Sequence, residues 1–286
     1  MATITVLAPA KLNLTLDVLG RREDGYHEIK MVMQLVSLAD EVTITVEPGE
    51  GIALRTDLGF LPVDERNLAV AAALRLREAV GGSWGRVSIA LNKHIPVCAG
   101  MAGGSSDAAA VLRGLNQLLD LGLSPRELAK IGEKVGSDVP YCVLGGTALA
   151  QGRGECITPL PALPPCHIVL AKPDFPVSTP ELYGQIDAKP PKCRPDTAGL
   201  IKALEEGDLP GVARRLFNVF EEVLPPRKRM RVEELKGELL RWGALGAGMS
   251  GTGPTVFGLF ADANAAQAAG EALKQLCSEV HVCKTI

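Results

Sequence analysis

The chain has 286 residues, enough for two domains, and its 47% hydrophobic content, net charge of −3 and pI of about 5.9 are ordinary for a globular protein. This charge balance gives no overall attraction to nucleic acid or anionic lipid, so an anionic ligand has to be bound locally. No apolar run approaches the length of a membrane span, and the first residues lack the basic region of a signal peptide. The seven cysteines are scattered, with no C-x-x-C pair. We therefore expect a cytoplasmic protein with reduced thiols that binds neither nucleic acid nor membranes.

The first part of the chain alternates between strand and helix patterns. Alternating apolar and polar residues predict strands at 3–7, 12–18, 41–47 and 86–91, with a turn at Asp24-Gly25. An alanine- and leucine-rich segment predicts a helix over 68–79, with Asn67 as its cap. A further helix begins near Ser106 and is buried along one side. Ser124-Pro125-Arg126-Glu127 is a capping box with proline at the first helical position, so the next helix runs to about Val135 and leaves Asp138 on a turn.

Four prolines between residues 158 and 165 suggest a linker, and they predict two domains, 1–158 and 159–286. In the second domain the patterns predict strands at 167–171, 255–260 and 280–285, and helices at 198–206, 209–222, 232–242 and 263–276, the last capped by Asp262. Strands and helices mix without strict βαβ alternation. The fold class predicted for both halves is therefore α+β.

A loop of small residues precedes the helix at Ser106. Its members are Val97, Cys98, Ala99, Gly100, Met101, Ala102, Gly103, Gly104, Ser105, Ser106 and Asp107. Small side chains let backbone N–H groups approach phosphate oxygens, the hydroxyls add donors and can reach a metal, and the helix dipole attracts the anion. The loop has neither the lysine of a Walker loop nor G-x-G-x-x-G spacing. On composition alone, a flexible connector that ends in a helix cap is as good an interpretation as a phosphate-binding loop.

A G-x-G-x-x-G string occurs later, as Gly246-Ala247-Gly248-Met249-Ser250-Gly251. A dinucleotide fingerprint follows a strand and opens a helix, whereas this string follows a helical pattern and leads through Pro254 into a strand. The pattern therefore disfavours a dehydrogenase. It predicts a tight helix-to-strand connection at 248–253, where another backbone or a ligand comes close.

Lys11 and Asp138 form a candidate catalytic pair. A cation near a carboxylate and a substrate hydroxyl holds the carboxylate ionised and favours the developing alkoxide, while the carboxylate accepts the proton. Each residue has an ordinary alternative: Lys11 as a lysine at a strand edge, and Asp138 as a turn residue.

Tyr26 and His27 follow the Asp24-Gly25 turn, where an aromatic ring can stack on a planar ligand and an imidazole can hydrogen-bond it. Tyr183 is a second candidate of this kind, although surface tyrosines are usually without function. The basic run 227–231 is followed at once by two glutamates and predicts a solvated helix start. The other histidines show no metal-ligand spacing, so metal ligands stay unassigned.

Three separated segments resemble the signature motifs of the GHMP kinases, a family that includes homoserine and mevalonate kinases. They are the segment around Lys11, the loop from Pro96 to Ala110, and residues 248–253. The resemblance extends from about Val6 to Phe260. Within the family, the segments 9–14, 24–28 and 136–140 look like those of members whose substrate is a cytidine diphosphate-linked sugar alcohol.

The resemblance implies a two-domain architecture, with an N-terminal ATP-binding α+β domain, a C-terminal ferredoxin-like α+β domain and the active site in the cleft. It implies transfer of the ATP γ-phosphoryl group to the 2-hydroxyl of that small-molecule substrate, in the non-mevalonate route to isoprenoid precursors. Asp138 would be the general base with Lys11 its partner, and residues 97–107 would wrap the ATP phosphates, bridged by Mg²⁺. The implied substrate contacts are Asn13, Tyr26, His27, Thr179, Tyr183, Gly248 and Ser250.

Two other functions stay open. One is a different small-alcohol kinase of the same family, of the mevalonate or homoserine type, against which the Tyr26-His27 pair argues. The other is a nucleotide-binding sensor without catalysis, against which the presence of both Lys11 and Asp138 argues. Asp107 adds a negative charge beside the expected phosphate site, which weakens nucleotide binding unless the carboxylate faces away or aids the metal.

Overall fold

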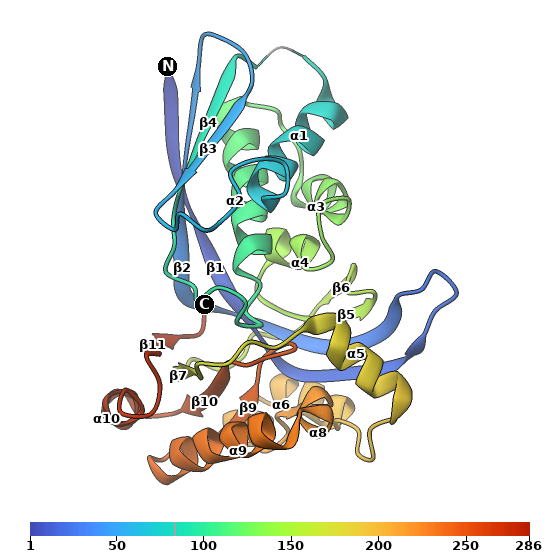
Figure 1. Ribbon diagram of the computed structural model, residues 1–286, viewed down its shortest axis with the longest axis vertical. Helices are drawn as coiled ribbons and strands as arrows, with labels where there is room; N and C mark the ends of the chain where they lie inside the picture. Colours follow the sequence, from blue (N-terminus) through green and yellow to red (C-terminus); the bar gives the residue numbers. More distant parts are fainter. Residues whose placement is uncertain (83) are drawn as a thin grey trace. The chain divides into compact units, whose positions relative to one another are not determined.

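The computed structural model describes residues 1–82 and 84–286 (Figure 1). Two compact units make up the chain. Unit 1 comprises Met1–Ala10, Leu38–Ile95 and Ala102–Gly145, and unit 2 comprises Lys11–Ser37, Pro96–Met101 and Gly146–Ile286. The units are discontinuous in sequence because the two longest strands, β1 (Ala2–Arg21) and β2 (His27–Glu47), each have residues in both. The domain division at residue 158 stays a prediction.

In unit 1 the end of β2 belongs to the seven-stranded sheet together with two further strands. β4 (Arg86–Asn92) pairs with it antiparallel, with Ile44 opposite Ile89, and β3 (Ile52–Thr56) pairs parallel to β4. Ile44 and Ile89 are buried, as the alternating pattern requires. The strands expected at 3–7 and 12–18 are both parts of β1, and the strands at 41–47 and 86–91 are confirmed.

Four helices accompany this sheet: α1 (Leu68–Val80), α2 (Gly103–Leu118), α3 (Pro125–Glu133) and α4 (Val139–Leu144). Asn67 accepts a hydrogen bond from the Ala69 N–H at 3.0 Å, and the capping box of Ser124 and Glu127 is present, so both expected caps are confirmed. α2 packs tightly on the strands, since a Cβ at Gly114 would lie 2.5 Å from the Ile44 Cδ1 atom. This packing holds α2, at whose start the expected phosphate loop ends, against the strands.

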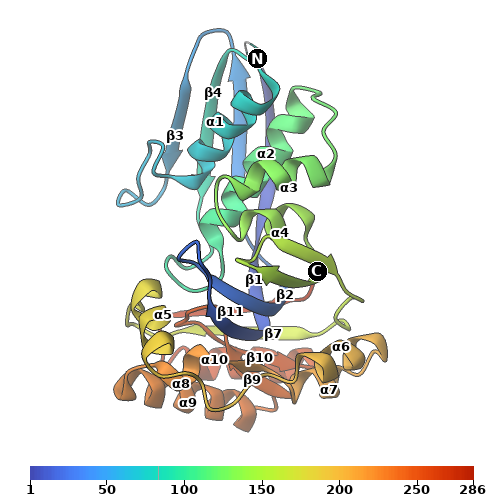
Figure 2. The same cartoon turned by 90° about the vertical axis from the view of Figure 1, so that its right-hand side faces the viewer.

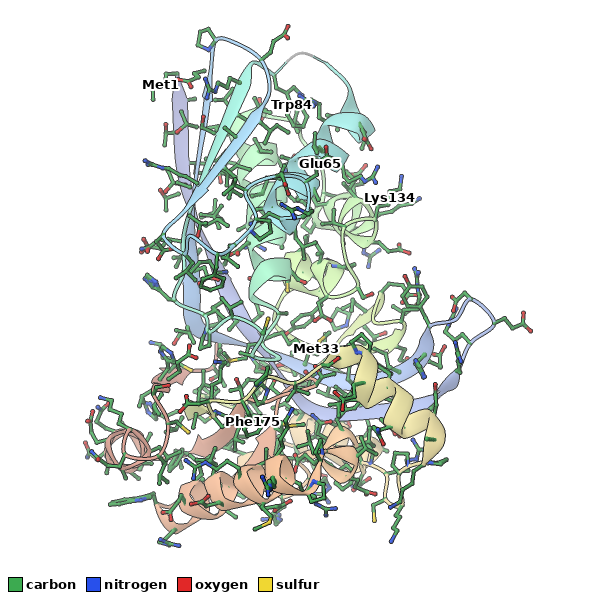
Figure 3. All side chains as sticks on the ribbon, viewed as in Figure 1. Met1, Met33, Glu65, Trp84, Lys134 and Phe175 are labelled. Atoms are coloured by element: carbon green, nitrogen blue, oxygen red, sulfur yellow. The ribbon has the colours of Figure 1, made fainter. Side chains whose placement is uncertain are left out.

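In unit 2 the beginning of β2 pairs antiparallel with β5 (Thr147–Gly152), and β5 pairs with β6 (Cys156–Pro159). Met33 of β2, labelled in Figure 3, is fully buried. The expected linker therefore starts too early, because residues 158 and 159 belong to β6. As an edge strand, β6 tolerates a proline at its end. Residues 160–165 have no regular structure, as predicted.

A second sheet in unit 2 is antiparallel, in the order β11 (Glu279–Lys284), β7 (His167–Lys172), β10 (Val256–Phe260), β9 (Gly246–Met249). Helices α9 (Pro226–Arg241) and α10 (Ala263–Leu273) pack against it (Figure 2). The Asp262 cap of α10 is confirmed by its 2.8 Å bond from the Ala265 N–H. α6 (Thr197–Glu205) also lies where the sequence predicts a helix, whereas α5 (Thr179–Ala188) was not predicted.

Two predictions for unit 2 are wrong. Residues 209–222 do not form one helix but α7 (Leu209–Ala213), the short strand β8 (Phe217–Asn218) and α8 (Phe220–Val223). β8 pairs parallel to β1 at Thr15 and Leu16, and this pairing outweighs helix propensity. Residues 248–253 are not a helix-to-strand connection either, since β9 and β10 form an antiparallel hairpin with a cis peptide bond before Pro254.

None of the seven cysteines is assigned to a disulfide bond in the described part of the chain. Among the helices that the structure describes, none is both long and apolar enough to cross a bilayer.

Candidate active site

The loop before α2 has the local geometry of an anion site. Ala102, in the left-handed region at φ 55°, precedes the first helical residue and gives no side-chain cap, and the first turn of α2 holds no acidic residue. The first N–H groups of α2 are therefore not satisfied by a cap, and the positive end of the helix dipole is not neutralised. A phosphate group fits such a helix start.

The N-terminal part of this loop joins the two other motif segments within unit 2. The Lys11 N–H donates to the Met101 carbonyl at 3.1 Å, and the Ser250 hydroxyl donates to the Gly100 carbonyl at 2.9 Å. Three segments separated by about 90 and 150 residues thus meet through backbone and hydroxyl groups. The structure brings together residues that the sequence only suggested belong together.

Asn13 is the centre of this junction. Its Oδ1 accepts from the Lys11 ammonium at 2.7 Å and from the Gly251 N–H at 2.9 Å, and its own N–H donates to the Ser250 hydroxyl at 3.3 Å. Lys11 is 4% exposed, Asn13 1% and Ser250 0%. The Asn13 amide oxygen therefore holds the buried Lys11 ammonium and the β9–β10 turn at the same point.

Gly100 allows the loop and the β9–β10 turn to touch. Its φ is +75°, and a Cβ there would lie 2.2 Å from the Ser250 carbonyl oxygen. We expect Gly100→Ala to lower the free energy of unfolding by roughly 2–4 kcal/mol, from left-handed strain plus displaced backbone. Chemical denaturation of the variant measures this. Gly20→Ala is the matched control, because a Cβ at Gly20 meets no atom within 4 Å; equal losses in the two variants would contradict the close contact.

Asp138 lies in unit 1, on the turn between α3 and α4, as predicted. The two helices pack closely at this turn, since a Cβ at Gly132 would lie 2.7 Å from the Val139 Cγ1 atom. Asp138 stands at the N-cap position of α4, yet its side chain makes no capping hydrogen bond. The carboxylate is half-buried and does not cap the start of α4. Its pairing with Lys11, a unit 2 residue, stays a prediction.

The aromatic candidates lie in unit 2. The rings of His27 and Tyr183 stack with centroids 4.6 Å apart at 32°, and Tyr183 meets Phe220 edge-on at 5.0 Å. His27 Nε2 is hydrogen-bonded to Asp187 Oδ1 at 2.8 Å, a partner that no sequence signal indicated. Tyr26 is 55% exposed, with the Arg153 guanidinium 5.1 Å from its ring centroid. The structure therefore joins His27 with Tyr183.

The remaining substrate candidates also lie in unit 2. The Thr179 hydroxyl, at the start of α5, is 2.9 Å from the Thr252 hydroxyl of the β9–β10 turn. Gly248 is buried in β9 opposite Phe257, and a Cβ there would lie 3.6 Å from both Leu216 and Phe257 side-chain atoms. The contacts of these residues with substrate stay predictions.

Asp107 is turned into the interior of unit 1. Its carboxylate is 2% exposed and lies 2.5 Å from the Lys93 ammonium, which also pairs with the buried Asp40. Asp40 Oδ1 in turn accepts the N–H groups of His94 and Ile95 at 2.6 and 2.8 Å. Lys93 therefore neutralises one of two buried charges, and Asp107 adds less negative charge at the loop than its position in the sequence suggests. No sequence pattern indicated this cluster.

Protonation of the cluster follows from its burial. The pKa of Asp107 is raised to about 7. Burial raises it most, the Lys93 ammonium lowers it, and the charge of Asp40 raises it. Asp107 Oδ1 has no hydrogen-bond partner among the residues that the structure describes, which adds to the cost of ionising it. Burial lowers the pKa of Lys93, but the carboxylates of Asp107 and Asp40 outweigh burial and hold this pKa above its ordinary value.

No group of three or more His, Cys, Asp or Glu side chains that could hold a metal ion occurs within residues 1–82 and 84–286. Oxygen donors near the loop are the hydroxyls of Ser105 and Ser106, of which Ser106 donates to the Pro9 carbonyl at 2.7 Å. Hydroxyl oxygens suit Mg²⁺, which usually takes few protein ligands besides phosphate and water.

Comparison with known proteins identifies the family. The model for the N-terminal domain of GHMP kinases matches residues 67–146, and the model for their C-terminal domain matches residues 200–279. A protein of Lachnospira eligens named 4-diphosphocytidyl-2-C-methyl-D-erythritol kinase is 46% identical over 275 residues, 96% of this chain and 95% of that protein. The chain belongs to the GHMP kinase family. A protein of the same name from Geobacillus thermodenitrificans is 48% identical, over 97% of this chain and 95% of its own length.

Solved GHMP kinase structures share the fold. A crystal structure of 4-(cytidine 5'-diphospho)-2C-methyl-D-erythritol kinase has a TM-score of 0.82 at 34% identity, covering 99% of both chains. Mevalonate kinase of L. major has a TM-score of 0.77 at 17% identity, covering 99% of this chain and 95% of its own. The second likeness shows the fold alone. The predicted α+β GHMP kinase fold and the assignment to an ATP-dependent kinase family are confirmed.

Proposed function

We propose that the protein transfers the γ-phosphoryl group of ATP to the 2-hydroxyl of 4-diphosphocytidyl-2-C-methyl-D-erythritol, a step towards isoprenoid precursors. The observation that carries this proposal is 46–48% identity, over nearly the whole chain, with proteins named as kinases of that compound. The mevalonate kinase of L. major, at 17% identity, shares the fold without comparable sequence similarity. The three motif segments bonded into one junction support the same proposal, because phosphoryl transfer depends on fixed positions more than on covalent chemistry.

ATP binds with its phosphates at the loop of residues 97–107. The open N–H groups at the start of α2 hold phosphate oxygens, and Gly103 and Gly104 leave room for their approach. Ser105 and Ser106 are the residues whose hydroxyl groups would hold Mg²⁺. When bound, Mg²⁺ neutralises charge on the transferred group.

Asp138 accepts the proton of the attacking hydroxyl, and the Lys11 ammonium stabilises the oxygen as negative charge develops on it. The half-buried Asp138 carboxylate is not used as a helix cap, and the Lys11 ammonium is held by a neutral amide. The roles of these two residues rest on the family resemblance.

The cytosine of the substrate is placed between Tyr26 and Tyr183 and is hydrogen-bonded by His27. Stacking of His27 on Tyr183 supports this arrangement, because it holds both rings in one place before substrate binds. The bond from His27 Nε2 to Asp187 leaves Nδ1 for the ligand. Asn13, Thr179, Gly248 and Ser250 hold the rest of the substrate through the junction and the β9–β10 turn.

Replacement of Tyr26 tests the cytosine platform. We expect Tyr26→Ala to raise the KM of the cytidyl substrate by about 10-fold or more, since a base–aromatic stack contributes about 1–3 kcal/mol, and to leave the KM of ATP within about twofold. Steady-state kinetics with each substrate varied in turn measures both constants. Phe60→Ala, which removes another exposed ring, is the control. Equal losses for ATP and for the cytidyl substrate would refute the platform.

The function itself is tested by ATP consumption with four acceptors: the cytidyl substrate, mevalonate, phosphomevalonate and homoserine. We expect turnover with the cytidyl substrate alone. Turnover with only one of the other three would make the protein a different small-alcohol kinase. ATP binding without turnover of any acceptor would favour a nucleotide-binding sensor.

Two further expectations belong to this proposal. The protein acts in the cytoplasm, where ATP is available, and it needs no nucleic-acid or membrane partner for its reaction. Residues 1–158 carry the ATP loop, Lys11 and Asp138, while residues 159–286 supply the third motif and Tyr183.

A further inference from the structure

The buried amide of Asn218 holds the backbone of the third motif. Asn218 lies in β8 and is 3% exposed. Its Nδ2 donates to the carbonyl oxygens of Met249 at 2.8 Å and Gly251 at 2.7 Å, and its Oδ1 accepts from the Phe220 N–H at 3.0 Å. Both amide hydrogens and the amide oxygen are therefore used, and the orientation of the side chain is fixed by its partners.

The peptide group on the other side of Gly251 reaches the junction. The Gly251 N–H donates to Asn13 Oδ1, the same oxygen that accepts from the Lys11 ammonium. A continuous set of hydrogen bonds thus leads from Asn218 through Gly251 and Asn13 to Lys11. All four residues belong to unit 2.

A second contact strengthens the hold on this turn. The Met249 N–H donates to Glu221 Oε1 at 3.0 Å, and the other oxygen of Glu221 accepts from the Lys236 ammonium at 2.6 Å. Residues 218–221 therefore bind the N–H and the C=O of Met249 as well as the carbonyl of Gly251. The start of the β9–β10 turn is fixed from β8 and α8, independently of its own hairpin bonds.

We propose that Asn218 is a positioning residue for phosphoryl transfer: by holding the carbonyl groups of Met249 and Gly251, on either side of the Ser250–Gly251 peptide, it places Asn13 and, through Asn13, the Lys11 ammonium. The proposal rests on the proposed function, in which Lys11 stabilises the attacking oxygen. Asparagine suits this position because it alone combines two amide donors with an acceptor on so short a side chain. Aspartate has the same shape, but it places a carboxylate oxygen where asparagine has its NH2 group. The attraction to the two carbonyl oxygens then becomes a repulsion.

Asn218→Asp tests the proposal by kinetics. We expect kcat to fall about 100-fold, the size of effect that a displacement of about 1 Å causes, with the KM values of ATP and of the acceptor within about threefold. We also expect activity to recover as pH falls, because the introduced carboxyl group gains a proton that it can donate to a carbonyl oxygen. A role in folding alone predicts neither the split between kcat and KM nor this pH profile.

Two further variants keep the test decisive. Asn218→Ser removes the two donors without adding charge, and it replaces Asn218→Asp if that variant does not fold. Leu200→Ala is the matched control, because Leu200 is fully buried on α6 in the same unit and belongs to none of these hydrogen bonds. We expect it to lower the melting temperature with kcat within about twofold of wild type. A kcat in both Asn218 variants as high as in Leu200→Ala would overturn the proposal.

Hydrogen exchange gives a readout that does not depend on activity. We expect exchange of the Gly251 amide, followed by NMR, to be at least about 10-fold faster in Asn218→Ser than in Leu200→Ala, because the carbonyl groups on either side of its peptide are no longer held. Unchanged exchange at Gly251 would overturn the proposal even if kcat falls. Absence of wild-type turnover with the cytidyl substrate would instead reject the proposed function, while the exchange result still decides whether Asn218 holds the turn.

Discussion

Replacing Asp138 by asparagine should lower kcat by about 10²–10⁴-fold, the contribution expected of a general base, and leave ATP binding near normal. The side-chain shape is kept while the ability to take a proton is lost. Asp138 makes no capping hydrogen bond to α4, so the change should not weaken the helix. A low kcat with an unchanged melting temperature would therefore report chemistry. Turnover with the cytidyl substrate and ATP titration by calorimetry measure the two effects.

Asp120→Asn is the control for this prediction. Asp120 lies in the same unit, is exposed, and has a φ of 50°, a conformation that asparagine also tolerates. It should retain full activity. If Asp138→Asn turns over as fast as Asp120→Asn, Asp138 is not the base, and Lys11 would have to act on a hydroxyl that loses its proton elsewhere.

Elements with strong local signals could be predicted from sequence. The cap at Asn67, the capping box at Ser124 and the cap at Asp262 all carry their own side-chain hydrogen bonds, so their helices begin where predicted. α5 has a comparable signal, because Ser178 lies three residues before Glu181 and accepts its N–H. The start of α5 therefore carries the same Ser-x-x-Glu signal as the start of α3.

Other elements depend on contacts distant in sequence. Phe217 and Asn218 form a strand only because β1 lies beside them, and Gly246–Met249 forms one only because β10 returns along it. Their composition favours helix or turn, so local patterns mispredict both.

The candidate site divides in the same way. Lys11, Asp138 and the loop stand out in the sequence as candidates because their residue types suit phosphoryl transfer, and their roles stay predictions from the family resemblance. The residues that support them do not stand out: Asp40 and Lys93 lie 53 residues apart, and Asn218 and Gly251 lie 33 apart. Each is an ordinary polar residue whose role appears only when folding buries it beside its partner.

Removing the charge of Lys93 should have the largest effect on stability. Lys93→Met keeps the length and apolar stem but leaves Asp40 and Asp107 buried side by side without a cation. Breaking a buried ion pair from one side costs about 3–5 kcal/mol, so we expect a loss of that size in the free energy of unfolding near pH 8. Urea denaturation followed by circular dichroism measures it. Lys130→Met, on α3 in the same unit, is the control, because Lys130 is exposed.

The dependence on pH distinguishes charge burial from lost packing. The pKa of Asp107 is about 7 in the folded protein against an ordinary value of 3.8, so the folded state binds the proton more tightly than the unfolded state. The stabilisation from this proton is complete below about pH 4 and is lost as pH rises through about 7. The penalty of Lys93→Met should accordingly be smaller at pH 5 than at pH 8. Adding Asp107→Asn to Lys93→Met should restore part of the stability at pH 8. A penalty that is the same at both pH values and unaffected by Asp107→Asn would mean that Lys93 contributes by packing and not by neutralising the buried carboxylates.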